Sequence, residues 1–226
     1  LLVFTLSFSA VTNISALNNS AVYSYSYKDY ETTILNSTNE YNICFEIVEN
    51  GEKIKLKGVC LHHDQGALGA VANRDAIERQ VKILKEMGCN AIRVTHNPAA
   101  RTLIDICNEK GMLVIEELFD GWHGAKNGNS QDYAKWYGTA VDQILGKNQE
   151  SMTWAEFDLR SVIRRDYNAP SIISWSLGNE VMEGIGIGVG EYPAQAKKLI
   201  GWACDEDSTR PVTFGDNKLK SNLAQS

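Results

Sequence analysis

The stretch SIISWSLGNE at residues 171–180 constrains the fold of this chain more than any other. It is a short apolar run, broken only by small serines, and it follows Pro170. Such a run is typical of a strand buried on both faces of a parallel sheet. The run ends in Asn179 and Glu180. In a (β/α) barrel the carboxyl ends of the strands face the active site, so Glu180 is a catalytic candidate. The alternative is a surface or helix-capping acid that merely follows a strand.

Strand and helix signals alternate on both sides of this stretch, which predicts an α/β fold with a parallel sheet. The expected strands lie at about 55–61, 91–95, 112–116, 171–177 and 211–214. The expected helix starts are an Asn73 cap, an Asn97 cap followed by Pro98, and a capping box formed by Thr153 and Glu156. Five strands are part of the eight that close a (β/α)₈ TIM barrel, so we predict a partial barrel.

Composition narrows the classes of function. The chain has 226 residues, of which 43% are hydrophobic and 22% charged, and these values are ordinary for a globular protein. A net charge of −6 gives no sign of a basic patch, which argues against a nucleic-acid partner. The five cysteines are an odd number without C-x-x-C spacing. We therefore interpret them as small buried hydrophobic residues rather than as a disulfide framework.

Four separated segments, in this order, resemble glycoside hydrolase family 2, which contains β-galactosidases, β-glucuronidases and β-mannosidases. The segments are KLKGVCLHHDQGALG at 55–69, GCNAIRVTHNP at 88–98, GMLVIEELFDGW at 111–122 and RRDYNAPSIISWSLGNE at 164–180. Several motifs in one order are more specific than any one alone. The resemblance implies a retaining exo-β-glycosidase, with β-galactosidase first and β-glucuronidase or β-mannosidase as alternatives. An inactive half-barrel that only binds carbohydrate is the alternative from another class.

The resemblance also assigns the central catalytic roles. Retaining glycosidases use two carboxyl groups about 5–5.5 Å apart, one as acid/base and one as nucleophile. Glu180 matches the family's acid/base, and Asn179 matches the residue that hydrogen-bonds the sugar 2-hydroxyl. The family's nucleophile is a glutamate on the seventh barrel strand, which we expect beyond Ser226. We therefore expect the 226 residues alone to be inactive.

Five further residues are expected at the pocket. Arg93 lies in a barrel strand, where an arginine needs a partner, and we expect it to hold a carboxylate, with a structural ion pair as the alternative. His96 resembles the family's sugar-contacting histidine. His63 and Asp64 follow strand one and are interpreted as pocket residues. Asp120 is expected to contact a sugar hydroxyl.

We expect no catalytic metal and no other cofactor. Metal-dependent barrel hydrolases place two ligands at H-x-H spacing, whereas the adjacent His62 and His63 point to opposite sides of a strand. Glu117 resembles an acid that binds magnesium in some β-galactosidases. The histidine that accompanies it there is replaced here by Phe119, which argues against that ion. The expected partner is a carbohydrate substrate.

The segment 118–150, between strand three and its helix, is unusually long for a loop and rich in Gly, Asn and aromatic residues. Long βα loops on this face of a barrel are usually functional. The segment carries Trp122, Tyr133, Trp136 and Tyr137. These side chains either form a wall for sugar stacking or pack the loop onto the barrel rim.

Three parts are expected along the chain. Residues 1–17 are uncharged and resemble the apolar region of a secretory signal peptide, which predicts a secreted or periplasmic protein. A strand of a preceding domain is the alternative, with a cytoplasmic location, and the run is too short for a membrane span. Residues 18–54 contain a hairpin signal at Asn50-Gly51 and are expected to be the remnant of an immunoglobulin-like β-sandwich and its linker. The barrel is expected at 55–226.

Overall fold

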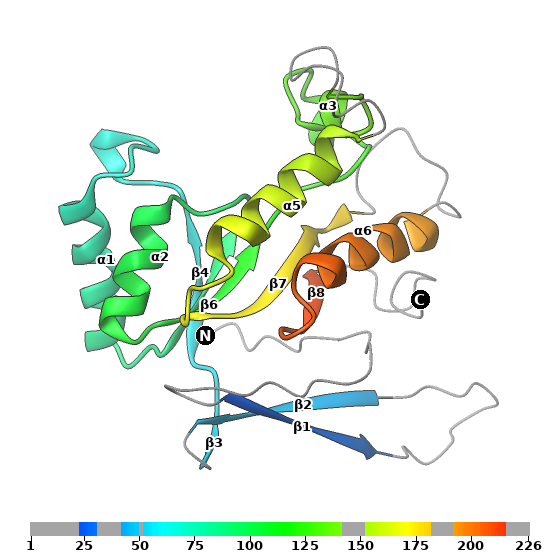
Figure 1. Cartoon of the computed structure of the whole chain (residues 1–226). Helices are drawn as coiled ribbons and strands as arrows, with labels where there is room; N and C mark the ends of the chain where they lie inside the picture. The colour runs from blue at the N-terminus through cyan, green and yellow to red at the C-terminus, as the bar shows by residue number, and fades with distance from the viewer. Residues whose placement is uncertain (1–22, 31–41, 50–51, 142–151, 182–191, 216–226) are drawn as a thin grey trace.

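The computed structural model describes residues 23–30, 42–49, 52–141, 152–181 and 192–215 (Figure 1). The expected signal-like segment 1–17 and the turn at Asn50-Gly51 lie outside the described residues. In the part of the chain that is described, no helix is long and apolar enough to cross a membrane.

A five-stranded parallel sheet forms the centre of the molecule. Its strands are β4 (Gly58–His62), β5 (Ala91–Thr95), β6 (Leu113–Glu117), β7 (Ile172–Asn179) and β8 (Val212–Gly215). They lie in sequence order, and every neighbouring pair is parallel. This arrangement is the first part of a (β/α)₈ barrel, and the predicted partial barrel is confirmed.

Helices cover the outer face of this sheet (Figure 1). They are α1 (Arg74–Glu86), α2 (Arg101–Lys110), α5 (Trp154–Asp166) and α6 (Tyr192–Glu206). The predicted caps at Asn73 and Thr153 are confirmed, because each side chain accepts a hydrogen bond from the backbone N–H three residues later. Gly111 ends α2 with a φ of 63°, a left-handed conformation that suits glycine.

The predicted start of α2 at Asn97 and Pro98 is wrong, since the helix begins at Arg101. The residues before it are held by tertiary contacts. The backbone N–H of Ala99 donates to the buried Glu116 carboxyl group at 2.7 Å. The carbonyl oxygen of Ala99 accepts a hydrogen bond from Arg165 at 2.9 Å. In a helix starting at Asn97 the carbonyl oxygen of Ala99 would accept from the N–H of Leu103, which here donates to the carbonyl oxygen of Ala100 instead.

The inner face of the sheet is divided into an apolar and a polar layer. At the amino end of the strands lies the floor cluster, formed by Ala91, Leu113, Ile115 and Ile173 with Ile54 and Leu56 packed against it. Alternate residues of a strand point to the same face. The next inward positions on β5 and β6 are therefore Arg93 and Glu117, at the carboxyl end. The candidate site thus lies above an apolar base.

A second, antiparallel sheet lies beside the amino ends of the barrel strands, at the bottom of Figure 1. It consists of β1 (Tyr23–Tyr30), β2 (Asn42–Glu49) and β3 (Glu52–Ile54) in the order β1-β2-β3. The pairing of β2 with β3 agrees with the predicted hairpin. The origin of this sheet in a β-sandwich domain stays a prediction.

The loop after β6 stands at the carboxyl ends of the strands, at the top of Figure 1. It contains the short helices η2 (Lys126–Gly128) and α3 (Ala134–Tyr137). Trp122 and Tyr137 are 0% and 1% exposed, so they pack this loop onto the barrel rim. The side chain of Trp136 is 49% exposed and keeps an open face.

Candidate active site

Glu117 lies at the centre of the polar layer. Its side chain is fully buried at the end of β6. Arg93 Nε and Nη2 donate to Glu117 Oε2 at 2.9 and 2.5 Å, and Ser176 Oγ donates to the same oxygen at 2.6 Å. His96 Nδ1 lies 2.6 Å from Oε1. A buried carboxylate is stable only when it is paired and hydrogen-bonded, and Glu117 meets both conditions. Arg93 thus has a carboxylate partner, which a structural ion pair would also give, and its role in substrate binding stays a prediction.

Arg93 also orients Asn179 at the end of β7. Arg93 Nη2 donates to Asn179 Oδ1 at 3.0 Å. On the other side of the amide, Asn179 Nδ2 donates to Asp120 Oδ1 at 3.3 Å. A positive donor and a carboxylate acceptor thus fix which end of the amide faces which neighbour. The structure brings together four of the predicted site residues, namely Arg93, His96, Asp120 and Asn179.

Glu180 follows Asn179 directly, at the mouth of the barrel. Its φ is 45°, a left-handed conformation that is strained for a residue other than glycine. Strain of this kind persists only where the surroundings enforce it, and it is concentrated at functional sites. The backbone N–H of Glu180 donates to the carbonyl oxygen of Gly215 in β8 at 2.6 Å.

Asp120 and Lys126 form an ion pair beside Asn179. Lys126 Nζ lies 2.8 Å from Asp120 Oδ1 and 2.7 Å from the carbonyl oxygen of Asn179. Partial burial raises the pKa of Asp120, but the hydrogen bond and charge of Lys126, helped by Asn179 and His96, hold that pKa below its usual value. Asp120 is therefore ionised at neutral pH.

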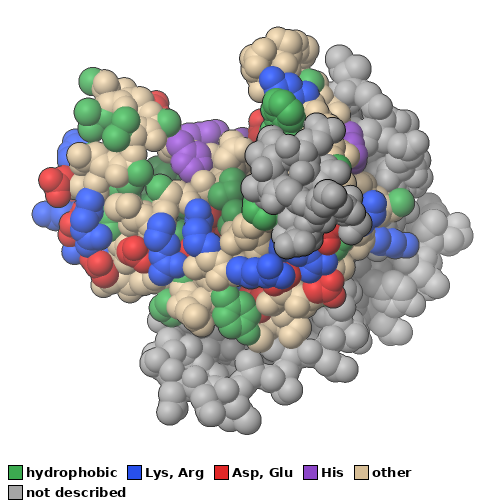
Figure 2. Space-filling view, turned by 45° about the horizontal axis from the view of Figure 1, so that its top comes forward, with side chains coloured by type: hydrophobic (Ala, Val, Ile, Leu, Met, Phe, Trp, Pro, Cys, Tyr) green, Lys and Arg blue, Asp and Glu red, His purple; other side chains and the backbone are tan. Residues whose placement is uncertain are grey.

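The two predicted residues after β4 each contact a backbone group. His63 Nε2 lies 3.0 Å from the carbonyl oxygen of Asn97, and Asp64 Oδ1 accepts a hydrogen bond from the backbone N–H of Gly66. The neighbouring His62, which the sequence analysis did not select, lies edge-on against His96 with ring centroids 5.2 Å apart. In Figure 2 histidine side chains lie in a saddle between two lobes of this face. The roles of His63 and Asp64 in substrate binding stay predictions.

The contacts of Glu117 bear on whether its carboxyl group could bind a metal ion. Both oxygens of this carboxyl group are in contact with Arg93, His96 or Ser176. An ion at this carboxylate would have to displace these partners. Among the described residues, no group of three or more His, Cys, Asp or Glu side chains is arranged to hold a metal.

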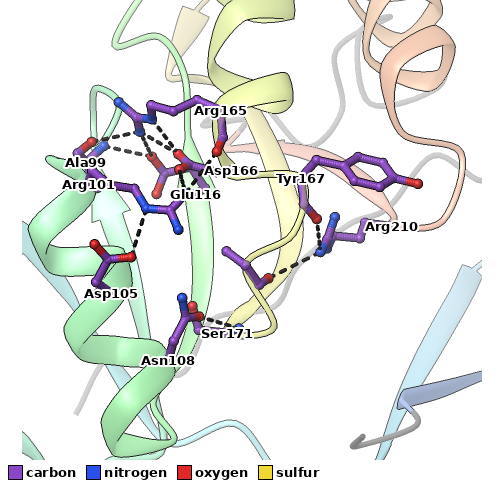
Figure 3. Close-up of polar contacts among 11 residues, drawn as sticks. Ala99, Arg101, Asp105, Asn108, Glu116, Arg165, Asp166, Tyr167, Ser171 and Arg210 are labelled. Atoms are coloured by element: carbon purple, nitrogen blue, oxygen red, sulfur yellow. Dashed lines mark hydrogen bonds and ion pairs between the residues drawn. The ribbon is translucent and has the colours of Figure 1, made fainter. Parts of the chain in front are cut away.

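A second buried acid, Glu116, lies on the opposite, helix-facing side of β6 (Figure 3). Burial raises its pKa to about 8. Its Oε1 accepts the hydrogen bond from Ala99, while its Oε2 has no hydrogen-bond partner in the described part of the chain. Arg165 approaches Oε1 at 3.8 Å but is hydrogen-bonded to Asp166. Glu116 thereby ties the segment after His96 to β6.

The sequence alone does not reveal the structural importance of Glu117, Ser176, Lys126 and Glu116. For Glu117 a signal was present. Arg93 aligns with Ile115 on β6, so a residue two positions later on the same face lies next to the arginine. Lys126 lies in a loop without periodicity, and no local pattern selects it.

Known proteins resemble this chain in both sequence and fold. The family profile described as "Glycosyl hydrolases family 2, TIM barrel domain" matches residues 45–225. The β-galactosidase BoGH2A of Bacteroides ovatus is 38% identical over 200 residues, which cover 76% of this chain and 22% of that protein. A putative β-glucuronidase of Formosa agariphila is 37% identical over 166 residues, which cover 74% of this chain and 14% of that protein.

A solved structure of the same family has a similar fold. A glycosyl hydrolase family 2 member from Bacteroides cellulosilyticus superimposes with a TM-score of 0.63 at 33% identity, over 80% of this chain and 23% of that one. The chain therefore spans about a fifth of the length of such relatives. The matched residues include β4 to β8 and every side chain of the polar layer. This chain belongs to glycoside hydrolase family 2 and carries part of the TIM barrel domain of that family.

Proposed function

We propose that this chain supplies the acid/base half of a retaining exo-β-glycosidase, with Glu180 as the acid/base. The observation that carries the proposal is the position of Glu180. It follows a strand end at which Arg93, Asp120 and Asn179 are hydrogen-bonded in one network, and its backbone is held in a strained conformation. Such pre-organised groups suit a proton transfer that requires exact placement.

Asn179 and Asp120 support the binding part of this proposal. Asn179 is oriented from both sides and lies directly before the acid, where an amide can hydrogen-bond the 2-hydroxyl of the bound sugar. That hydrogen bond strengthens as the oxocarbenium-like transition state forms. Asp120 is ionised, and its side chain is 43% exposed, so it can accept a hydrogen bond from a second sugar hydroxyl.

The nucleophile in this proposal is a carboxylate from outside the 226 residues. Glu117 is a poor substitute, because its oxygens are already bonded to Arg93, His96 and Ser176. The 226 residues alone are therefore inactive, and a longer protein that completes the barrel is active. A β-galactoside is the first candidate substrate, since a β-galactosidase is among the relatives. β-Glucuronides and β-mannosides are the alternatives, and export from the cytoplasm remains part of the proposal.

The test uses a longer protein that carries this chain and a complete barrel. Glu180→Gln should slow hydrolysis of alkyl glycosides about 10²–10⁴-fold, because these substrates need a proton on the leaving group. Dinitrophenyl glycosides should be affected much less, and azide should restore their turnover.

The matched control is Glu86→Gln, which changes an exposed acid on α1. Aryl β-galactoside, β-glucuronide and β-mannoside are compared to find the sugar. Equal rates for Glu180→Gln and the wild type on both leaving groups would remove Glu180 from the mechanism.

A further inference from the structure

The loop after β6 makes side-chain hydrogen bonds to the end of β7. The ladder between β7 and β8 is regular up to Ser176 and irregular between Ser176 and Asn179. Over this irregular part the loop donates to two β7 carbonyl oxygens. Trp122 Nε1 donates to Leu177 at 2.9 Å, and Lys126 Nζ donates to Asn179 at 2.7 Å. The loop therefore bonds the part of β7 that precedes the proposed acid.

The contact of Lys126 acts on one peptide group. The carbonyl oxygen of Asn179 and the N–H of Glu180 belong to the same planar unit. Lys126 holds the oxygen at 2.7 Å, and Gly215 accepts from the N–H at 2.6 Å. When both ends of a planar peptide are fixed, the position of the next Cα is fixed, and only rotation about φ then sets the direction of its side chain. Here that side chain is Glu180, whose φ of 45° needs enforcement.

Lys126 is itself well placed for this contact. Its side chain is only 13% exposed. The two residues after it, Asn127 and Gly128, have φ values of 53° and 67°, and both residue types adopt left-handed backbone readily. Its backbone N–H donates to Asp132 at 3.2 Å within the loop. The ammonium group of Lys126 is therefore mostly buried and paired with Asp120, and the loop conformation holds it in this position.

We propose that Lys126 is a positioning residue for catalysis, which holds the Asn179–Glu180 peptide and the Asp120 carboxylate in place from the loop after β6. This inference rests on the proposed function, because it gives Lys126 a role through Glu180. Lys126 acts through these neighbours and transfers no proton itself. The loop after β6 thereby takes part in orienting the acid.

The test compares three variants in the longer protein described above. Lys126→Met removes the ammonium group and keeps most of the stem. Lys126→Arg keeps a cation and should recover most of the activity. Lys135→Met is the matched control, since Lys135 lies in the same loop, is exposed, and its side chain contacts Gln131 and the ring of Trp136.

Lys126→Met should lower kcat on alkyl glycosides about 10²-fold, as expected when a catalytic group is misplaced by about 1 Å. The loss should be much smaller on dinitrophenyl glycosides, which do not need the acid. A general destabilisation would affect both substrates alike.

The pH profile gives a second readout. Without Lys126 the pKa of Asp120 rises, so the acidic limb of kcat/KM should move to higher pH. The other titratable or charged groups near these strand ends include His96, Arg93, Glu117 and Glu180, which all three variants retain.

Amide hydrogen exchange at Glu180 separates failure of this inference from failure of the proposed function. The exchange should accelerate in Lys126→Met and stay unchanged in Lys135→Met, whether or not the protein hydrolyses glycosides. If the wild type is active while Lys126→Met behaves like the control in rate, leaving-group dependence and exchange, the inference is overturned and the proposed function stands. If the wild type hydrolyses no glycoside, the proposed function fails, and unchanged exchange at Glu180 overturns the inference as well.

Discussion

Replacing Glu116 by glutamine should stabilise the barrel at alkaline pH and destabilise it at acid pH. Glu116 is fully buried, and burial raises its pKa from 4.5 to about 8. The groups near it are Arg165 and Asp166 on α5 and Cys107 on α2, and the charge of Glu117 acts from the other face of β6. The folded state therefore keeps a proton that the unfolded chain releases above about pH 4.5.

The magnitude follows from the size of this shift. Each unit of pKa difference corresponds to about 1.4 kcal/mol, so the wild type loses about 4 kcal/mol of stability between pH 5 and pH 8 through this group alone. Glutamine at this position cannot ionise, and its oxygen can still accept from Ala99. Its amide hydrogens lack partners among the described residues, which costs about 1–3 kcal/mol at every pH. We expect the variant to be less stable at pH 5 and more stable at pH 8.

Amide hydrogen exchange of β6 measures this difference, because it reports the free energy of opening of a chosen element. The free-energy difference between Glu116→Gln and the wild type should rise steadily from pH 5 to pH 8. Glu86→Gln, which changes an exposed acid, should show no such rise. A difference that is constant across this pH range would refute the assigned ionisation of Glu116.

Three further predictions concern packing, a buried hydrogen bond and metals. Gly178→Ala should lower the free energy of unfolding by about 1–3 kcal/mol, because the new Cβ would lie 2.5 Å from Val181 Cγ1; an unchanged melting temperature would contradict this. Trp175→Phe removes the donor to Asp207 Oδ2 at 2.8 Å and should destabilise the protein by about 1–3 kcal/mol in urea unfolding, whereas an unchanged midpoint would show that the bond contributes nothing. Prolonged chelation should leave most glycosidase activity intact, since Glu117 is occupied by protein donors, and a loss reversed by zinc or magnesium would overturn this expectation.

The order of strands and helices could be predicted because its signals are local. Asn73 and Thr153 accept hydrogen bonds from residues three positions later, so their sequence neighbours decide the outcome. Gly111 ends α2 by its own conformational freedom. The buried strand at 171–177 is recognisable because both of its faces are covered.

Features set by tertiary contacts could not be predicted in the same way. Asn97 and Pro98 carry a helix-start signal, but the carbonyl oxygen of Ala99 accepts from Arg165 rather than from a helical N–H, and the helix starts at Arg101. The pairing of Arg93 with Glu117 depends on the register between β5 and β6. The contact of Lys126 with the carbonyl oxygen of Asn179 depends on the path of an irregular loop back to β7, and no sequence periodicity encodes that path.

The floor cluster has a consequence for where this barrel unit starts along the chain. Ile54, the last residue of β3, and Leu56 precede the first barrel strand, yet they pack under the sheet against the apolar inner residues of β5, β6 and β7. A truncation that begins at Gly58 would keep every barrel strand described here and still leave that base open to water. The boundary expected between residues 54 and 55 separates Ile54 from the cluster that it covers. The match to the family profile begins at residue 45 and therefore includes both Ile54 and Leu56, in agreement with their packing against the barrel strands.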